Sequence, residues 1–219
     1  MDNFFQDREF FHEHIDWISD HIDRYFPDAE ITVFHEFLPS SLKIHVYFIK
    51  PANADYNVLL TEGMSTLAMN VHESVEDKDN YKFAELMMVI PRDMEFGEVY
   101  TTDSKNSYAI TMLKETARFP HYYDTWVGEG HSIVTGAEME PYSVETRFVG
   151  GILLPSVTFS EDVMSIQREG RVINIYSFFP LYEDEVQYKV AHGYDAFLDL
   201  LIEKDAPEIL DNDRPGLLS

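Results

Sequence analysis

The sequence contains no cysteine, so neither a disulfide framework nor a thiolate metal site can form. A chain without thiols is typical of a reducing compartment, so we expect a cytoplasmic protein. Its first residues are acidic where a secretory signal peptide needs bases, and no apolar run approaches the ~18 residues that a membrane span requires. We therefore expect neither export by that route nor anchoring by a membrane helix.

Basic residues are scarce: 16 Lys and Arg stand against 40 Asp and Glu, and the formal net charge is -24. A field of this sign repels phosphate backbones and anionic lipid surfaces, which argues against nucleic acid and membranes as direct partners. The same field accelerates encounter with a basic protein. The alternative interpretation is that the surplus carboxylates only keep the surface soluble.

Enzyme motifs are also missing. The sequence has no phosphate-cradling Gly-x-x-x-x-Gly-Lys loop, no Gly-x-Ser-x-Gly elbow and no His-Glu-x-x-His pair. The absence of these motifs argues against catalysis without excluding it.

Apolar side chains recur at three- and four-residue spacing between residues 10 and 26, which predicts an amphipathic helix that ends before Pro27. The predicted apolar face consists of Phe11, Ile15, Ile18, Ile22 and Tyr25. The three histidines of this helix, His12, His14 and His21, are interpreted as surface or boundary residues, because no third metal ligand shares a face with any two of them.

Segments rich in β-branched and aromatic residues predict strands at 30–37, 43–50, 56–62, 85–90, 148–154 and 172–179. The breaker run at 38–41 predicts that the first two form a hairpin or meander. The continuous apolar run at 85–90 is typical of a central strand that is covered on both faces.

Helical spacing returns at 107–119, where Pro120 is expected to end the helix. A second helical region is predicted to start at Pro180, to break at Gly193, and to restart with Asp195 as N-cap for residues 196–204. Strands and helices are interspersed without regular alternation. The sequence therefore predicts a single α+β domain, a mixed β-sheet flanked by helices, with its core at about 28–204 and an acidic, frayed tail at 205–219.

The densest cluster of polar and aromatic residues lies between residues 119 and 132. Tyr122, Tyr123 and Trp126 are candidate recognition anchors, since large aromatic side chains are enriched at interface hot spots; the alternative for each is a core position. A second interpretation makes His121, Asp124 and His131 the ligands of a divalent metal. Loops rich in glycine, aspartate and aromatic residues are, however, more often structural turns or binding surfaces than metal sites.

An acidic triplet, Glu183, Asp184 and Glu185, follows Pro180. Carboxylates at the start of a helix are stabilised by the helix dipole, so capping is one role for them. Contact with a basic partner is the other.

Several motifs recur in the order of a known family. They are Leu60-Thr61-Glu62-Gly63-Met64-Ser65, Ala84-Glu85-Leu86-Met87-Met88, Ile90-Pro91, Ala117-Arg118-Phe119-Pro120-His121, Asp124-Thr125-Trp126, Gly130-His131-Ser132-Ile133 and Pro180-Leu181-Tyr182 with Glu185, Tyr188-Lys189 and His192-Gly193. In content and order this set resembles the suppressor-of-fused domain. The resemblance runs from about the first strand to the last helix.

The resemblance implies an α+β domain without a cofactor. In animals, relatives bind an extended peptide of Gli-family transcription factors by strand addition, in a groove between this domain and a second one, and this chain ends near the end of the first domain. Gly130 stands where the animal relatives suggest an acidic residue, and Glu129 would substitute for it. Single-domain members resemble bacterial proteins regarded as immunity partners of secreted toxins.

Together these observations predict a cytoplasmic, acidic immunity protein that neutralises a basic toxin. The predicted contact residues are His121, Tyr122, Tyr123, Asp124, Trp126, Glu129, His131, Glu183, Asp184 and Glu185. Two alternatives stay open: a regulatory adaptor that binds a transcription-factor peptide by strand addition, and a metal-dependent enzyme that uses His121, Asp124 and His131. A small-molecule sensor would need a deep apolar pocket.

Overall fold

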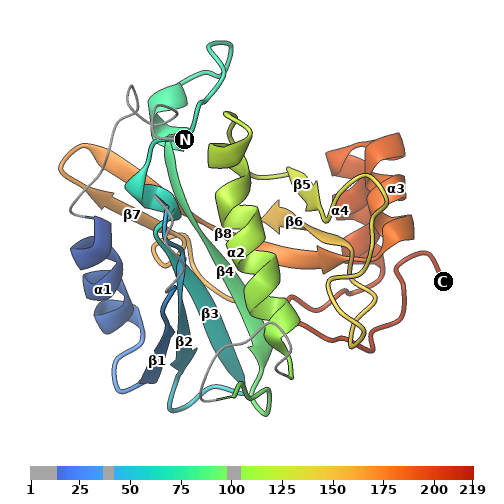
Figure 1. Ribbon diagram of the computed structural model, residues 1–219, viewed down its shortest axis with the longest axis horizontal. Helices are drawn as coiled ribbons and strands as arrows, with labels where there is room; N and C mark the ends of the chain where they lie inside the picture. The colour runs from blue at the N-terminus through green and yellow to red at the C-terminus, as the bar shows by residue number, and fades with distance from the viewer. Residues whose placement is uncertain (1–13, 37–41, 98–104) are drawn as a thin grey trace.

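The computed structural model describes residues 14–36, 42–97 and 105–219. Their elements form an α+β domain in which helices flank one mixed sheet, as predicted (Figure 1). The helices are α1 (His14–Tyr25), α2 (Ser107–Tyr122), α3 (Glu183–His192) and α4 (Tyr194–Glu203), with short 3-10 helices η1 (Met64–Thr66) and η2 (Lys78–Tyr81). The strands are β1 (Glu30–Phe34), β2 (His45–Lys50), β3 (Tyr56–Glu62), β4 (Phe83–Pro91), β5 (Ser132–Val134), β6 (Gly150–Leu154), β7 (Ser165–Arg168) and β8 (Arg171–Leu181).

The strands follow the order β1-β2-β3-β4-β8-β6-β5, and β7 pairs with β8 beside this path. All neighbours are antiparallel except β4 and β8, which run parallel. The hairpin of β1 and β2, the strand β3 and the central position of β4 confirm the sequence predictions. The short strands β5 and β7 were not predicted, because three or four residues are too few to establish a period.

Helices α1 and α2 cover opposite faces of the sheet, and α3 and α4 pack beside β6 and β8 (Figure 1). β4 contributes to both faces because successive side chains of a strand alternate. Leu86 and Met88 join the apolar cluster around α2, whereas Phe83 and Met87 join the cluster around α1. This two-sided burial explains why the sequence of β4 is almost continuously apolar.

The turn between β3 and η1 requires glycine at position 63. Gly63 has a φ of 123°, and an added Cβ would lie 2.0 Å from the carbonyl oxygen of Lys43. Any other residue at this position would have a strained backbone, and its Cβ would clash with the backbone of Lys43. The close approach packs the start of η1 against the segment that leads into β2.

The buried carboxylate of Glu85 receives the donors of this turn. Its Oε1 accepts hydrogen bonds from the Ser65 hydroxyl (2.6 Å) and from the N–H groups of Ser65 and Gly63 (2.9 Å each), and its Oε2 accepts one from the Thr61 hydroxyl (2.6 Å). Burial nevertheless raises the pKa of Glu85, and these hydrogen bonds oppose that rise. The charged motif residue at the centre of the sheet is therefore structural.

Helix α1 buries Ile18 and Ile22 as predicted, but its buried face is rotated from the one predicted. His14 and His21 are only 4% and 6% exposed, whereas Ile15 is 48% exposed. His21 Nε2 lies 2.8 Å from the carbonyl oxygen of Val163, and His14 Nε2 lies 2.9 Å from the Thr66 hydroxyl. Both imidazoles can be buried because distant polar groups form hydrogen bonds with them. The interpretation of His14 and His21 as surface or boundary residues was therefore wrong. His12 lies outside the described residues.

Two prolines do not act as predicted. Pro120 lies inside α2, which continues to Tyr122, because only one hydrogen bond is lost and the Pro120 carbonyl is satisfied by the N–H of Thr125 (2.9 Å). Pro180 lies within β8 instead of starting a helix. The pairing of β8 with β4 extends only to Ser177, so the proline occupies a part of β8 where a missing N–H is tolerated.

The C-terminal region also differs from prediction. Gly193, with a φ of 90°, separates α3 from α4 as expected, but it is itself the N-cap of α4, and Asp195 lies in the first turn. The segment 205–219 was predicted to fray. Leu210, Arg214 and Leu217 are instead buried against the domain.

Among the described residues, no helix combines the length and the apolar character needed to cross a membrane.

Candidate partner-binding groove

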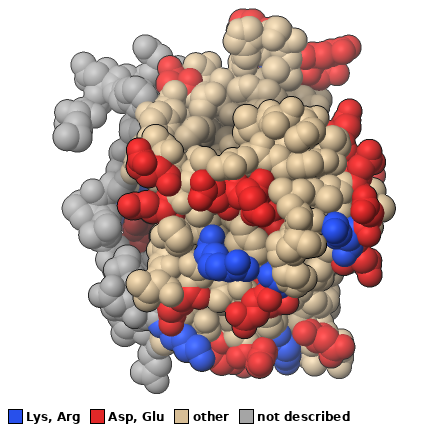
Figure 2. Space-filling view, turned by 90° about the vertical axis from the view of Figure 1, so that its right-hand side faces the viewer, with Lys and Arg blue, Asp and Glu red and all other residues tan. Residues whose placement is uncertain are grey.

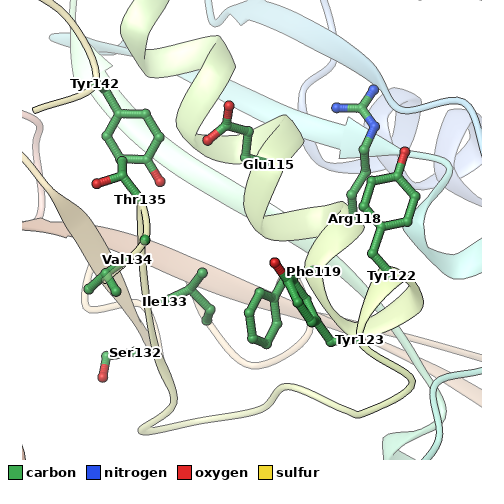
Figure 3. Close-up of a pocket in the computed structure, with 11 residues that line it drawn as sticks. Glu115, Arg118, Phe119, Tyr122, Tyr123, Ser132, Ile133, Val134, Thr135 and Tyr142 are labelled. Carbon is green, nitrogen blue, oxygen red and sulfur yellow. The ribbon is translucent and has the colours of Figure 1, made fainter. Parts of the chain in front are cut away.

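A groove of about 390 Å³ lies between the C-terminal half of α2 and the edge strand β5 (Figure 3). One wall consists of Glu115, Arg118, Phe119 and Tyr122 of α2 with its C-cap Tyr123, and the other of Ser132, Ile133, Val134, Thr135 and Gly136 with Tyr142. All three residues of β5 line the second wall, although side chains of a strand alternate between faces. The backbone edge of β5 therefore borders the groove. We call this feature the α2–β5 groove.

β5 ends the path of the sheet, so its outer edge has no neighbouring strand within the described ranges. Toward β6, the carbonyl of His131 accepts a hydrogen bond from Leu153 N–H, and the N–H of Thr135 donates to the Val149 carbonyl (2.9 Å each). Alternate residues of an antiparallel strand face the same neighbour. The backbone groups of Ser132 and Val134 therefore point away from β6 and form an open sheet edge.

Aromatic side chains form the rim of the groove on the helix side. Tyr122 and Tyr123 are 53% and 70% exposed, and the ring centroid of Phe119 lies 4.8 Å from that of Tyr123. Figure 3 shows that these side chains extend from the last turns of α2. Their exposure is compatible with the predicted role of Tyr122 and Tyr123 as recognition anchors, which stays a prediction.

Trp126 and His131 form a compact aromatic cluster at the end of the loop that leads into β5. The Trp126 ring makes edge-on contacts with Tyr81 and His131, at centroid distances of 5.9 and 4.6 Å. Nδ1 of His131 accepts a hydrogen bond from the N–H of Gly128 (3.2 Å). Burial, followed by the positive charge of Lys189, lowers the pKa of His131. The imidazole is thus held neutral and in a fixed orientation.

His121 and Asp124 are placed differently from the predicted metal ligands. His121 is fully buried, and its Nε2 lies 3.0 Å from the Met64 carbonyl oxygen, so it fixes η1 to the end of α2. Asp124 is exposed in a left-handed conformation, and its carbonyl accepts a hydrogen bond from the Asn70 side chain (3.2 Å). Across the described part of the chain, no group of three or more His, Asp or Glu side chains is arranged to hold a metal. The three predicted ligands do not form a site, and the burial of His121 removes it from the predicted contact surface.

Glu129 lies on the surface between the groove and α4. Its Oε1 accepts a hydrogen bond from the Tyr194 hydroxyl (2.7 Å). Burial and this hydrogen bond raise the pKa of Tyr194. Glu129 therefore anchors its loop to α4 while its charge stays exposed.

The acidic triplet divides between two roles. Glu183 and Asp184 are exposed and border a separate hollow with Met139 and Pro141. Glu185 is fully buried and completes a capping box in which its Oε2 accepts the N–H of Tyr182 (2.9 Å). Capping is thus its role, and its burial excludes it from the predicted contact surface.

Two charged residues of the groove were not predicted, Glu115 and Arg118. Arg118 forms an ion pair with Glu36, a contact across 82 residues of sequence. Burial raises the pKa of Glu115, and Arg118 opposes the rise. The β-branched run at 133–135 was the available signal for an edge strand, but only its pairing with β6 reveals where it lies.

Comparison with known proteins agrees with this architecture. Residues 39–215 match the family model described as Suppressor of fused protein (SUFU). A comparison with curated proteins gives no match.

Three solved structures share the fold. A protein from Neisseria gonorrhoeae described as a SUFU (suppressor of fused protein) homolog superposes with a TM-score of 0.68 at 13% identity, over 94% of this chain and 98% of that one. The Sufu–Fu complex gives 0.59 at 12% identity, over 94% and 92%. Drosophila Suppressor of Fused gives 0.60 at 12% identity, over 94% of this chain but 51% of the fly protein, so the chain spans about half of that relative. Because the family model matches most of this chain, the chain belongs to the suppressor of fused family.

Proposed function

We propose that this domain is a non-catalytic module that binds another protein, by adding an extended segment of that partner to the outer edge of β5. The observation that carries the proposal is the open backbone edge at Ser132 and Val134 beside an aromatic groove. In strand addition, main-chain hydrogen bonds supply affinity and pockets for alternate side chains supply specificity. The α2–β5 groove provides the second of these.

The charges around the groove favour a basic partner. Glu115 lines it, and Asp124, Glu129 and Glu138 are exposed on the adjoining segments. Arg118, which also lines the groove, is neutralised by its ion pair with Glu36. Figure 2 shows acidic side chains spread over the face that carries α3 and α4, with fewer basic side chains among them, so the partner would approach a mainly acidic surface from that side as well.

The finer proposal is that the chain acts in the cytoplasm as an immunity protein whose partner is a toxin. Toxins that attack nucleic acid need basic surfaces to hold phosphate, and a protein of net charge -24 would be steered onto them. A regulatory adaptor for an endogenous transcription factor would use the same groove. The two differ in the partner alone, so identification of the partner separates them.

The first experiment identifies the partner and tests the edge of β5. Purified protein is used to capture binders at low and moderate salt, and each captured protein is identified by mass spectrometry and assayed for activity. Val134→Pro removes an outward N–H while leaving the pairing with β6 in place, and we expect it to weaken capture about tenfold or more. Val144→Pro is the matched control, since Val144 is exposed at the second position of the turn closed by Ser143 and Thr146, where proline is tolerated.

Charge reversal tests the electrostatic part separately. Replacing Glu115 and Glu129 by lysine should slow association with the captured partner and flatten its salt dependence. The matched control reverses the charges of Glu161 and Asp162, which are exposed and do not line the α2–β5 groove. Unchanged capture by Val134→Pro would refute strand addition, and unchanged kinetics of the double reversal would refute a basic partner at this groove.

A further inference from the structure

A second cavity, of about 440 Å³, lies between the sheet and α4. Leu154 and Phe179 line it from β6 and β8, Leu198 and Leu201 line it from α4, and Asp205 and Glu208 line it from the segment that follows. None of these residues belongs to the α2–β5 groove. The volume lies within the range of about 300–1,000 Å³ that is typical of small-molecule sites.

The mouth of this cavity carries two exposed aliphatic side chains, which is unusual at a polar surface. Val157 and Ile202 both belong to its lining, and they are 87% and 78% exposed. An apolar lining that continues onto an apolar rim indicates contact with an apolar group rather than with water alone.

A carboxylate is fixed in the wall of the cavity. Oε2 of Glu208 accepts hydrogen bonds from the Ser156 hydroxyl (3.0 Å) and from the N–H groups of Val157 (3.0 Å) and Thr158 (2.8 Å). Oε1 accepts one bond, from the Ser177 hydroxyl (2.6 Å). An ionised carboxylate offers about four acceptor sites over its two oxygens, so Oε1 retains capacity for a further donor.

The charge of the cavity is of one sign. Asp205 adds a second, exposed carboxylate at its edge, and the described residues that line the cavity include no lysine, arginine or histidine. A ligand with an anionic head would meet two negative groups, whereas an ammonium group would form charge-assisted hydrogen bonds. The chemistry of the lining therefore selects for a cation attached to an apolar body.

We propose that this cavity binds a small amphiphilic cation, an aliphatic or aromatic body that carries one primary ammonium group. The body packs against Leu198, Leu201 and Phe179, and the ammonium donates to Oε1 of Glu208 with Asp205 nearby. This site is independent of the proposed partner groove, because no lining residue is shared.

The test is to titrate the whole chain with 2-phenylethylamine and, separately, with 3-phenylpropionate, which has a similar body and the opposite charge. Binding is monitored by the shifts of amide signals in two-dimensional NMR spectra. We expect saturable shifts from α4 and residues 205–208 with the amine alone. Glu208→Gln should weaken binding about tenfold, because it removes a charged acceptor. Glu203→Gln, on the exposed side of α4 and outside the lining, should leave it unchanged.

Two further variants keep the test valid if Glu208→Gln disturbs the 156–158 loop that it holds. Asp205→Asn should weaken binding about threefold, and asparagine tolerates the positive φ of 49° at this position. Ala206→Phe should abolish binding by filling the cavity, while Val190→Phe, at an exposed position on α3, should not. The proposal would be overturned if 3-phenylpropionate bound as tightly as 2-phenylethylamine, or if the amide shifts caused by the amine did not saturate. Binding of the amine to the Ala206→Phe variant would overturn it as well.

Discussion

Two buried glutamates hold two regions of this domain together by different means. In the region formed by β3, η1 and β4, Glu85 is surrounded by neutral donors, two hydroxyls and two backbone amides. In the region formed by β8, α3 and the C-terminal segment, Glu185 makes paired hydrogen bonds with Arg214, at 2.6 and 2.5 Å, and also accepts the N–H of Leu217 (3.0 Å). Both carboxylates are fully buried.

A buried carboxylate is tolerated in both regions because its acceptors receive hydrogen bonds. The type of donor, neutral or charged, determines how strongly the loss of a partner or a change of pH affects the stability of the fold. Neutral donors leave the cost of burying a charge in place, and the pKa of Glu85 is accordingly raised. A guanidinium compensates the charge, so that loss of the partner leaves an uncompensated ion.

The largest effect is expected when the guanidinium is removed. Arg214→Met leaves Glu185 buried without its counter-charge and should lower the free energy of unfolding by about 3–5 kcal/mol. It also removes the hydrogen bond to the Pro180 carbonyl (3.0 Å). Urea denaturation followed by circular dichroism measures the change.

Arg168→Met is the matched control for that prediction. Arg168 pairs with Asp20 at 2.9 Å, but both side chains are largely exposed, so the loss should be below about 1 kcal/mol. Equal effects of the two substitutions would show that the buried pair has no special weight.

An intermediate effect is expected for Glu85→Gln. An amide must place two N–H hydrogens among these donors, whereas the neutral carboxyl of Glu85 carries a single O–H, so we expect a loss of about 1–3 kcal/mol in acidic solution. The folded-state pKa of Glu85 lies above its ordinary value of 4.5, so the folded protein holds this proton more tightly than the unfolded chain does. The stability that the neutral acid contributes is therefore complete below pH 4.5 and declines as the pH rises through the raised pKa.

Glu85→Gln has no such proton, so the advantage of the wild type over the variant should shrink as the pH rises from 4.5. Denaturation curves of both proteins at several pH values between 4 and 8 measure this difference, while titration of the other carboxylates cancels between them. A difference that grows with pH would mean that Glu85 is stabilised as the anion.

The smallest effect is expected for Ser65→Ala, which removes one hydroxyl from Glu85 and leaves the backbone donors of Ser65 and Gly63 in place. The expected loss is about 1 kcal/mol, the usual net value of one hydrogen bond. Thermal unfolding compared with Ser160→Ala, at an exposed position, measures it. A loss as large as that of Glu85→Gln would indicate that the hydroxyl alone holds the carboxylate.

Much of the fold followed from local pattern. The predicted strand at 56–62 coincides with β3, and the apolar run at 85–90 lies at the centre of the sheet because both of its faces are covered. The candidate site followed only in part. The sequence pointed to Tyr122 and Tyr123, which border the α2–β5 groove, but also to His121, which is fully buried and does not line it.

The acidity of the protein, the periods of its longer helices and strands, and the absence of thiol chemistry can be read from the sequence, because each is a property of composition or of a short window. Which polar residues are buried and which strand has an open edge depends on how the chain folds. His21 is buried because the Val163 carbonyl, 142 residues away, accepts a hydrogen bond from its ring, and β5 has an open edge because it pairs only with β6 among the described strands. Such properties depend on contacts between distant segments, and no local period records them.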